Sequence, residues 1–142
     1  MTDEGGDAAC WAERVCDGCG AVVESGTDHR CVRTARLDAL HSSQGADGVV
    51  WSLGGPRQIE ANLVDLGPGG LIAEHVNQDV DLLMLVLGGS ATIVADGQAR
   101  ALALHDLALV PRGSRRAVVA GPDGCQYLSV HTARPGPTIR TR

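Results

Sequence analysis

Thiol and imidazole side chains gather near the start of the chain, with a spacing that suits metal binding. Cys16 and Cys19 stand three positions apart, and His29 and Cys31 follow after nine intervening residues. Gly20, directly after the second thiol, favours a tight turn whose backbone N–H groups donate to sulfur. Three thiolates and one imidazole suit tetrahedral Zn²⁺. We therefore expect a structural zinc ion held by Cys16, Cys19, His29 and Cys31.

Other interpretations of these cysteines stay open. Cys10 is a fifth candidate ligand that can replace His29 and complete an all-thiolate site. A redox dithiol is less favoured, because the segment lacks the strand–helix context of thioredoxin-like motifs. Idle reduced thiols are the remaining alternative. The CxxCG segment resembles half of a zinc ribbon or rubredoxin-type site. The N-terminus is acidic and lacks the apolar stretch of an export signal. We therefore expect a reducing, cytoplasmic compartment in which metal binding prevails over disulfides.

A second set of polar residues lies in the later part of the chain. His75 and Asn77 occupy positions i and i+2 of an apolar run, so their side chains share one face of a predicted strand. An imidazole or a carboxylate serves as base or metal ligand, whereas a guanidinium binds carboxylate or phosphate. The candidate catalytic residues are therefore His75, Asp81 and His131. The candidate ligand-binding residues of this set are His75, Asn77 and Asp81.

Short apolar runs separated by turn residues must position these side chains. About nine such runs fall between Val49 and His131, with turns rich in Gly and Pro between them. Asp96-Gly97, between two apolar runs, is typical of a tight hairpin turn. This spacing predicts an all-β antiparallel sandwich or barrel. Residues 32–41 are expected to form one short helix, and residues 42–48 a linker.

The polar residues and glycines of this region resemble the first motif of the cupin superfamily, Gly-x5-His-x-His-x3/4-Glu-x6-Gly. Here Gly69, His75, Asn77, Asp81 and Gly88 occupy its positions. The second motif, Gly-x5-Pro-x-Gly-x2-His-x3-Asn, keeps its Pro and Gly at residues 111 and 113. The resemblance covers residues 50–132 and is strongest to small single-domain bacterial cupins. It implies a double-stranded β-helix, or jelly-roll, barrel.

Departures from the motifs bear on function. By resemblance, the ligands of metal-binding cupins correspond here to His75, Asn77, Asp81 and Arg116. A guanidinium cannot ligate a metal and repels a dication, so these residues disfavour a metal in the barrel. We expect Arg116 to form a buried ion pair with Asp81. The alternative is that Arg116 binds a carboxylate or phosphate ligand.

The last predicted strand, residues 126–131, has one polar and one apolar face. Tyr127, Ser129 and His131 alternate with Leu128 and Val130. We expect the apolar face to point into the barrel. In the alternative arrangement, His131 and Tyr127 line the pocket, and His131 acts as a base or a replacement ligand.

Composition narrows the classes of function. The 142 residues carry a net charge of -5 and no Lys, which argues against nucleic-acid binding, and no apolar run reaches membrane-spanning length. We expect a disordered tail (1–9), a Cys-rich zinc-knuckle segment with its linker (10–48), the barrel (49–132) and a C-terminal tail (133–142). The predicted function is binding of a small polar or anionic ligand, or of a protein partner, in the barrel. A cupin-type isomerase, lyase or cyclase and a metal-dependent oxygenase are the alternatives, and the resemblance implies a homodimer.

Overall fold

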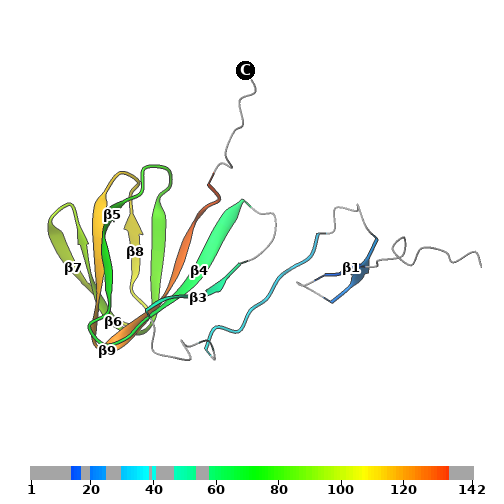
Figure 1. Cartoon of the computed structure of the whole chain (residues 1–142), viewed down its shortest axis with the longest axis horizontal. Helices are drawn as coiled ribbons and strands as arrows, with labels where there is room; N and C mark the ends of the chain where they lie inside the picture. Colours follow the sequence, from blue (N-terminus) through cyan, green and yellow to red (C-terminus); the bar gives the residue numbers. More distant parts are fainter. Residues whose placement is uncertain are drawn as a thin grey trace, which may run out of the picture. The chain divides into compact units, whose positions relative to one another are not determined.

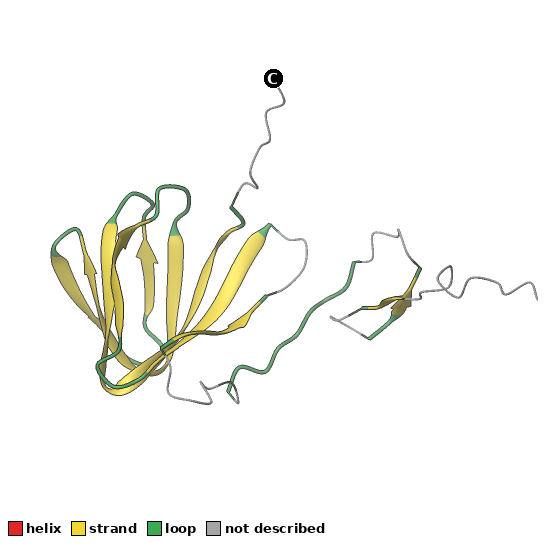
Figure 2. Cartoon of the chain, in the orientation of Figure 1, coloured by secondary structure: helices red, strands yellow, loops and turns green. Residues whose placement is uncertain are grey.

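The computed structural model describes residues 14–16, 20–24, 30–38, 40, 47–53 and 58–134. The chain divides into two compact units, Met1–Arg36 and Leu37–Arg142. All regular elements of the described residues are strands (Figure 2), which confirms the all-β class. The predicted helix over residues 32–41 is wrong where the structure describes it: residues 32–37 are irregular, and Leu40 N donates to Leu37 O across a turn. Its apolar periodicity was too weak to favour a buried helix face. Among all the residues that the structure describes, no helix is long and apolar enough to cross a membrane.

The first unit contains a two-stranded hairpin. Strand β1 (Arg14–Val15) pairs antiparallel with β2 (Val22–Val23). Cys16 closes the turn, because its N–H donates to Ala21 O and its carbonyl accepts from Gly20 N, both at 2.8 Å. Gly20 has a φ of 73°, a left-handed conformation that glycine adopts without steric cost. Cys16 and Gly20, the first and last residues of the CxxCG sequence, are therefore joined where β1 ends and β2 is about to begin.

The second unit is a barrel of seven described strands, visible as two facing layers in Figure 1. Strands β6 and β9 are long enough to run through both layers. The first half of β6 pairs with β8 and the last half of β9, whereas its second half pairs with β7 and the first half of β9. The strands are β3 (Gly48–Ser52), β4 (Ile59–Leu66), β5 (Leu71–Val76), β6 (Leu82–Ala95), β7 (Gln98–Leu102), β8 (Leu107–Val110) and β9 (Arg115–Thr132).

Glycines allow the two long strands to bend between the layers. The β6–β9 register shifts on both sides of the Gly88–Gly89 pair. Gly89 has a φ of 64°, and a Cβ there would collide with the carbonyl oxygen of Gly124 on β9. The backbone of β9 can approach β6 this closely only because residue 89 carries no side chain. The bend folds one continuous sheet into two layers, and their inner faces meet.

Apolar side chains fill the space between the layers. Leu66, Met84, Val86, Ile93 and Val118 are buried in one cluster. Tyr127 and Cys125 belong to the same cluster. At the opposite end from the bend, the β5–β6 and β8–β9 turns lie side by side, because Gly113 N donates to Asn77 O at 2.7 Å. The barrel therefore has a closed apolar end and a more polar end.

Candidate functional site

A pocket of about 280 Å³ opens at the polar end of the barrel. Its walls come from both layers, so that residues far apart in the sequence face one another. A larger hollow of about 400 Å³ lies between β7 and β8, but it is mainly apolar and contains none of the predicted site residues. The smaller pocket is lined by Gly48, Val49, Val64, Ile72, His75, Asn77, Leu82, Arg116, Val118, Tyr127, Ser129, His131 and Arg134.

Arg116 is the most unusual residue of this pocket. It stands in β9 between His75 of β5 and Ala95 of β6, and only 5% of it is exposed. Its Nη1 is buried and has no hydrogen-bond partner among the described residues. Burial lowers the pKa of the guanidinium, Tyr127 opposes that effect, and Arg134 adds to it. Because a buried cationic donor without an acceptor is costly, Arg116 is a group that an anion would satisfy.

Asp81 does not face Arg116. It is exposed, lies outside the pocket lining, and its Oδ1 accepts a hydrogen bond from Arg112 N at 2.8 Å. The predicted buried ion pair between Asp81 and Arg116 is therefore wrong. Asp81 ends the β5–β6 turn, where its side chain joins this turn to the β8–β9 turn. Motif spacing placed the residue at the correct end of the barrel, but a turn leaves the direction of a side chain free.

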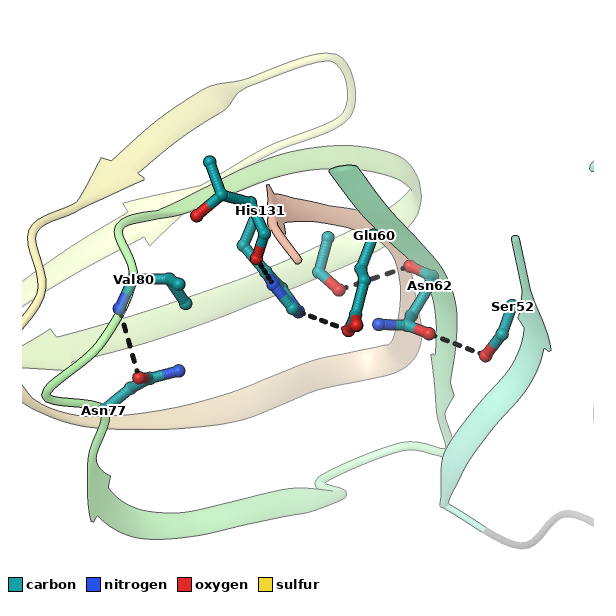
Figure 3. Close-up of polar contacts among 8 residues, drawn as sticks. Ser52, Glu60, Asn62, Asn77, Val80 and His131 are labelled. Atoms are coloured by element: carbon teal, nitrogen blue, oxygen red, sulfur yellow. Dashed lines mark hydrogen bonds and ion pairs between the residues drawn. The ribbon is translucent and has the colours of Figure 1, made fainter. Parts of the chain in front are cut away.

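His75 and Asn77 do lie at the pocket with Arg116. The Nδ1 of His75 is 2.8 Å from Ala73 O. Asn77 is buried, and its Oδ1 accepts from Asp79 N at 3.0 Å and from Val80 N at 3.4 Å. Figure 3 shows the Asn77–Val80 contact. These bonds occupy the amide oxygen of Asn77 and fix the turn that forms one rim of the pocket.

The polar face of the last part of β9 points into the barrel. Tyr127 and Ser129 are buried and line the pocket with His131, so the expected inward apolar face is wrong. Leu128 and Val130 instead stand beside Leu85 and Leu83 of β6 on the outer face. The alternation of side chains from Tyr127 to His131 was predicted correctly. The choice of face depended on apolar neighbours of the other strands, which the isolated strand does not reveal.

Glu60 adds a carboxylate beside this face, and the sequence analysis missed it. It is opposite His131 in the β4–β9 pairing, and its Oε2 is 3.6 Å from His131 Nε2 (Figure 3). The other ring nitrogen, Nδ1, is 2.8 Å from Thr132 O. Both nitrogens of His131 therefore face oxygen acceptors. The alternation of Glu60, Asn62 and Val64 along β4 was the available signal.

Tyr127 is a neutral hydroxyl group in this pocket. Burial raises its pKa to about 12, with Cys125 adding to the effect and Arg116 opposing it. Burial, followed by the charge of Asp65, likewise raises the pKa of Cys125 to about 11. A phenol held neutral next to a guanidinium can donate a hydrogen bond to an anion.

The donor set at the polar end does not fit a transition metal. The described residues contain no group of three or more His, Cys, Asp or Glu side chains that could hold an ion. At the positions that the resemblance assigns to ligands, Asn77 uses its amide oxygen on the backbone, Asp81 faces away and Arg116 carries a positive charge. An anion fits these residues better than a dication does.

In the first unit, the structure brings together two of the four predicted zinc ligands. The sulfur atoms of Cys16 and Cys31 are 3.3 Å apart. Cys19, His29 and Cys10 lie outside the described residues. Two thiols at this distance can share one ion, because each Zn–S bond is about 2.3 Å long.

Comparisons with known proteins bear on the fold. No family model matches the chain, and no curated protein matches it. Among solved structures, it resembles the cupin domain of Schizosaccharomyces pombe Cnp3, with a TM-score of 0.55, 15% identity and coverage of 58% of this chain and 62% of that domain. The chain thus spans less than two thirds of that domain.

The match spans a larger share of two bacterial structures. A Klebsiella pneumoniae protein with a double-stranded beta-helix domain has a TM-score of 0.61, 21% identity and coverage of 70% of this chain and 89% of that one. A sugar phosphate isomerase from a cupin superfamily, from Silicibacter pomeroyi, has a TM-score of 0.56, 24% identity and coverage of 72% and 76%. The second unit of this chain therefore has the cupin fold, a double-stranded β-helix.

Proposed function

We propose that the barrel binds a small organic anion in its polar-end pocket without a metal. The observation that carries this proposal is that Arg116 lines the pocket and that its buried Nη1 has no hydrogen-bond partner among the described residues. Tyr127 and Ser129 supply hydroxyl groups beside it, and none of the described lining residues is a carboxylate. A carboxylate or phosphate oxygen in this position accepts a charge-assisted hydrogen bond from the guanidinium.

The test is thermal stabilisation of the full chain by acetate and by inorganic phosphate at constant ionic strength. A ligand that binds the folded state raises the melting temperature by mass action. We expect Arg116→Met to remove the stabilisation while the fold persists, because an apolar side chain replaces an unsatisfied buried charge. Arg112→Met, at an exposed position, is the matched control. Absence of stabilisation of the wild-type chain by either anion, or its persistence in Arg116→Met, contradicts the proposal.

An enzymatic function is the second candidate, favoured by the contact between Glu60 and His131 at the same pocket. A carboxylate that orients an imidazole prepares it to take a proton from a bound substrate. The sugar phosphate isomerase among the structural relatives shows that this fold supports catalysis. If the protein is an enzyme, His131→Asn should abolish turnover. Binding of the substrate should persist, because Arg116 is unchanged.

For the first unit we propose a structural zinc ion held by Cys16, Cys19, Cys31 and either His29 or Cys10. The support is the backbone pairing of Cys16 with Gly20 and Ala21, and the 3.3 Å between the sulfurs of Cys16 and Cys31. When bound, zinc supplies folding free energy to a segment that has little apolar surface to bury. Thiolate ligands also fit the reducing, cytoplasmic compartment that we propose for the chain.

We further propose that two chains associate as a homodimer through the outer face of the barrel. Leu107 and Leu109 of β8 are more than half exposed and pair with Leu85 and Leu83 of β6. Together with Leu128 and Val130 they make a continuous apolar surface, which a protein in water tends to cover. A monomer in sedimentation at micromolar concentration, with Leu109→Glu unchanged, would contradict this arrangement.

A further inference from the structure

A second arginine, Arg134, lies at the same pocket, within the segment that the sequence analysis assigned to the C-terminal tail. Strand β9 ends at Thr132, yet the backbone continues in a fixed course because Ala133 N donates to Gln58 O at 2.8 Å. Arg134 is thereby held at the rim and lines the pocket with Arg116. The rim residue is exposed and the inner one is buried, so the two guanidinium groups differ in depth.

The two cations influence each other and have no counter-charge in the pocket lining. Burial lowers the pKa of Arg116 most, Tyr127 opposes that effect, and the charge of Arg134 at the same pocket lowers the pKa further. The carboxylate of Glu60 faces His131, and that of Asp81 binds a backbone N–H outside the pocket. Glu74 pairs with exposed Arg115 at 3.2 Å. Converging like charges are unfavourable until an anion lies between them.

We propose that Arg116 and Arg134 form a clamp that selects a compact dianion over a monoanion. This inference rests on the proposed function and adds the charge of the ligand to it. The shared chemistry is two negative charges on one small molecule, as in a phosphoryl group or a short dicarboxylate. Apolar side chains also line the pocket and accommodate an apolar body, namely Val49, Val64, Ile72, Leu82 and Val118. A volume of about 280 Å³ limits the ligand to metabolite size.

Calorimetric titration of the full chain tests the clamp, with acetate as the monoanion and with malonate and dianionic inorganic phosphate as the two dianions. Ionic strength is held constant. We expect both dianions, or one of them, to bind at least about tenfold more tightly than acetate, as one additional charge-assisted hydrogen bond provides. The malonate and phosphate arms then tell a dicarboxylate from a phosphoryl ligand. Arg134→Gln should lose this preference and leave acetate binding nearly unchanged, whereas the control Arg112→Gln should retain it.

The two proposals fail in different ways. Equal affinity for acetate and both dianions, or an Arg134→Gln variant that keeps the preference, overturns the clamp and leaves anion binding at Arg116 standing. Absence of binding of all three probes by the wild-type chain overturns both. Arg134 is exposed, so its variant is expected to melt at the wild-type temperature, and this measurement accompanies each titration.

Discussion

The hairpin of the first unit and the barrel of the second have different sources of order. The barrel buries Leu66, Met84 and Val86 almost completely between its layers. The hairpin leaves Val15 and Val22 62% and 58% exposed, and backbone hydrogen bonds join Cys16 to Gly20 and Ala21. An isolated two-stranded hairpin is marginal in water. Apolar burial therefore accounts for the order of the barrel, whereas for the hairpin we propose that zinc bound by its cysteines supplies the missing stability.

Removal of zinc should separate the two regions most clearly. We expect a chelator, or Cys16→Ser, to release about one zinc ion per chain and to unfold the hairpin, because structural zinc contributes on the order of 10 kcal/mol to such segments. The barrel should keep its strand signal and melting temperature. Elemental analysis with circular dichroism measures both effects. If the metal stays bound in Cys16→Ser but is lost in His75→Ala, the ion lies in the barrel. The barrel, and not the hairpin, would then be the region that holds metal.

A Gly→Ala change in each region compares how well the backbone of the barrel and that of the hairpin tolerate a side chain. Gly89→Ala places a Cβ against the carbonyl of Gly124 and should lower the free energy of unfolding by more than about 3 kcal/mol, or prevent folding. Gly20→Ala meets no atom within 4 Å, so only its positive φ opposes the change, at about 1 kcal/mol. Urea denaturation of the two variants checks the difference. Similar losses would show that the bend of β6 tolerates a side chain.

Alkaline pH should weaken the barrel through its buried acids. The pKa of Tyr127 rises from 10.0 to about 12 in the folded chain, so the folded state keeps a proton that the unfolded state has lost. The free energy of unfolding must then fall as pH rises between these values, by about 1.4 kcal/mol per unit at most for each group. Cys125 contributes in the same direction between 9.0 and about 11.

The pKa of Tyr127 can be measured directly from the ultraviolet absorbance of its phenolate, because Tyr127 is the only tyrosine of the chain. Arg116→Met should raise its pKa further, because the guanidinium favours the phenolate. Cys125→Ala is the control that removes the thiol contribution. Titration near the ordinary tyrosine value in the folded chain would mean that the pocket is more hydrated than the burial of Tyr127 indicates.

Asp81→Ala should have the smallest effect. The change removes one exposed hydrogen bond to Arg112 N and is expected to lower the free energy of unfolding by about 1 kcal/mol or less. A buried ion pair with Arg116 would instead cost about 3–5 kcal/mol when broken. Urea denaturation distinguishes the two values, and a loss of the larger size would show that Asp81 has a buried partner.

Strand periodicity and turn residues predicted an antiparallel sandwich or barrel, and the resemblance to the cupin motifs implied the barrel. The apolar runs, about nine in number, correspond to the seven strands β3 to β9, because β6 and β9 each contain two of the runs. Alternation within a strand is a local property, so the sequence carries it directly. Motif spacing likewise brought His75, Asn77 and Arg116 to one pocket.

The misplaced and missed parts of the site depend on contacts between distant segments. Asp81 faces Arg112 because two turns meet, and Arg134 reaches the pocket because Ala133 binds Gln58. Glu60 lies beside His131 only through the register of β4 with β9. Register and turn direction follow from the packed barrel as a whole, and a single sequence window does not contain them.

The position of β9 in the chain has a consequence for synthesis on the ribosome. This strand is the last described one to be translated, yet it pairs with β4, β5 and β6 and carries both Arg116 and His131. A nascent chain that has emerged only as far as β8 therefore lacks the ladder partner of β5 and exposes open strand edges. Such edges invite pairing with other chains, so the growing polypeptide needs shielding until Thr132 is free. Closure of the barrel and creation of the binding pocket are then a single late event in the life of the molecule.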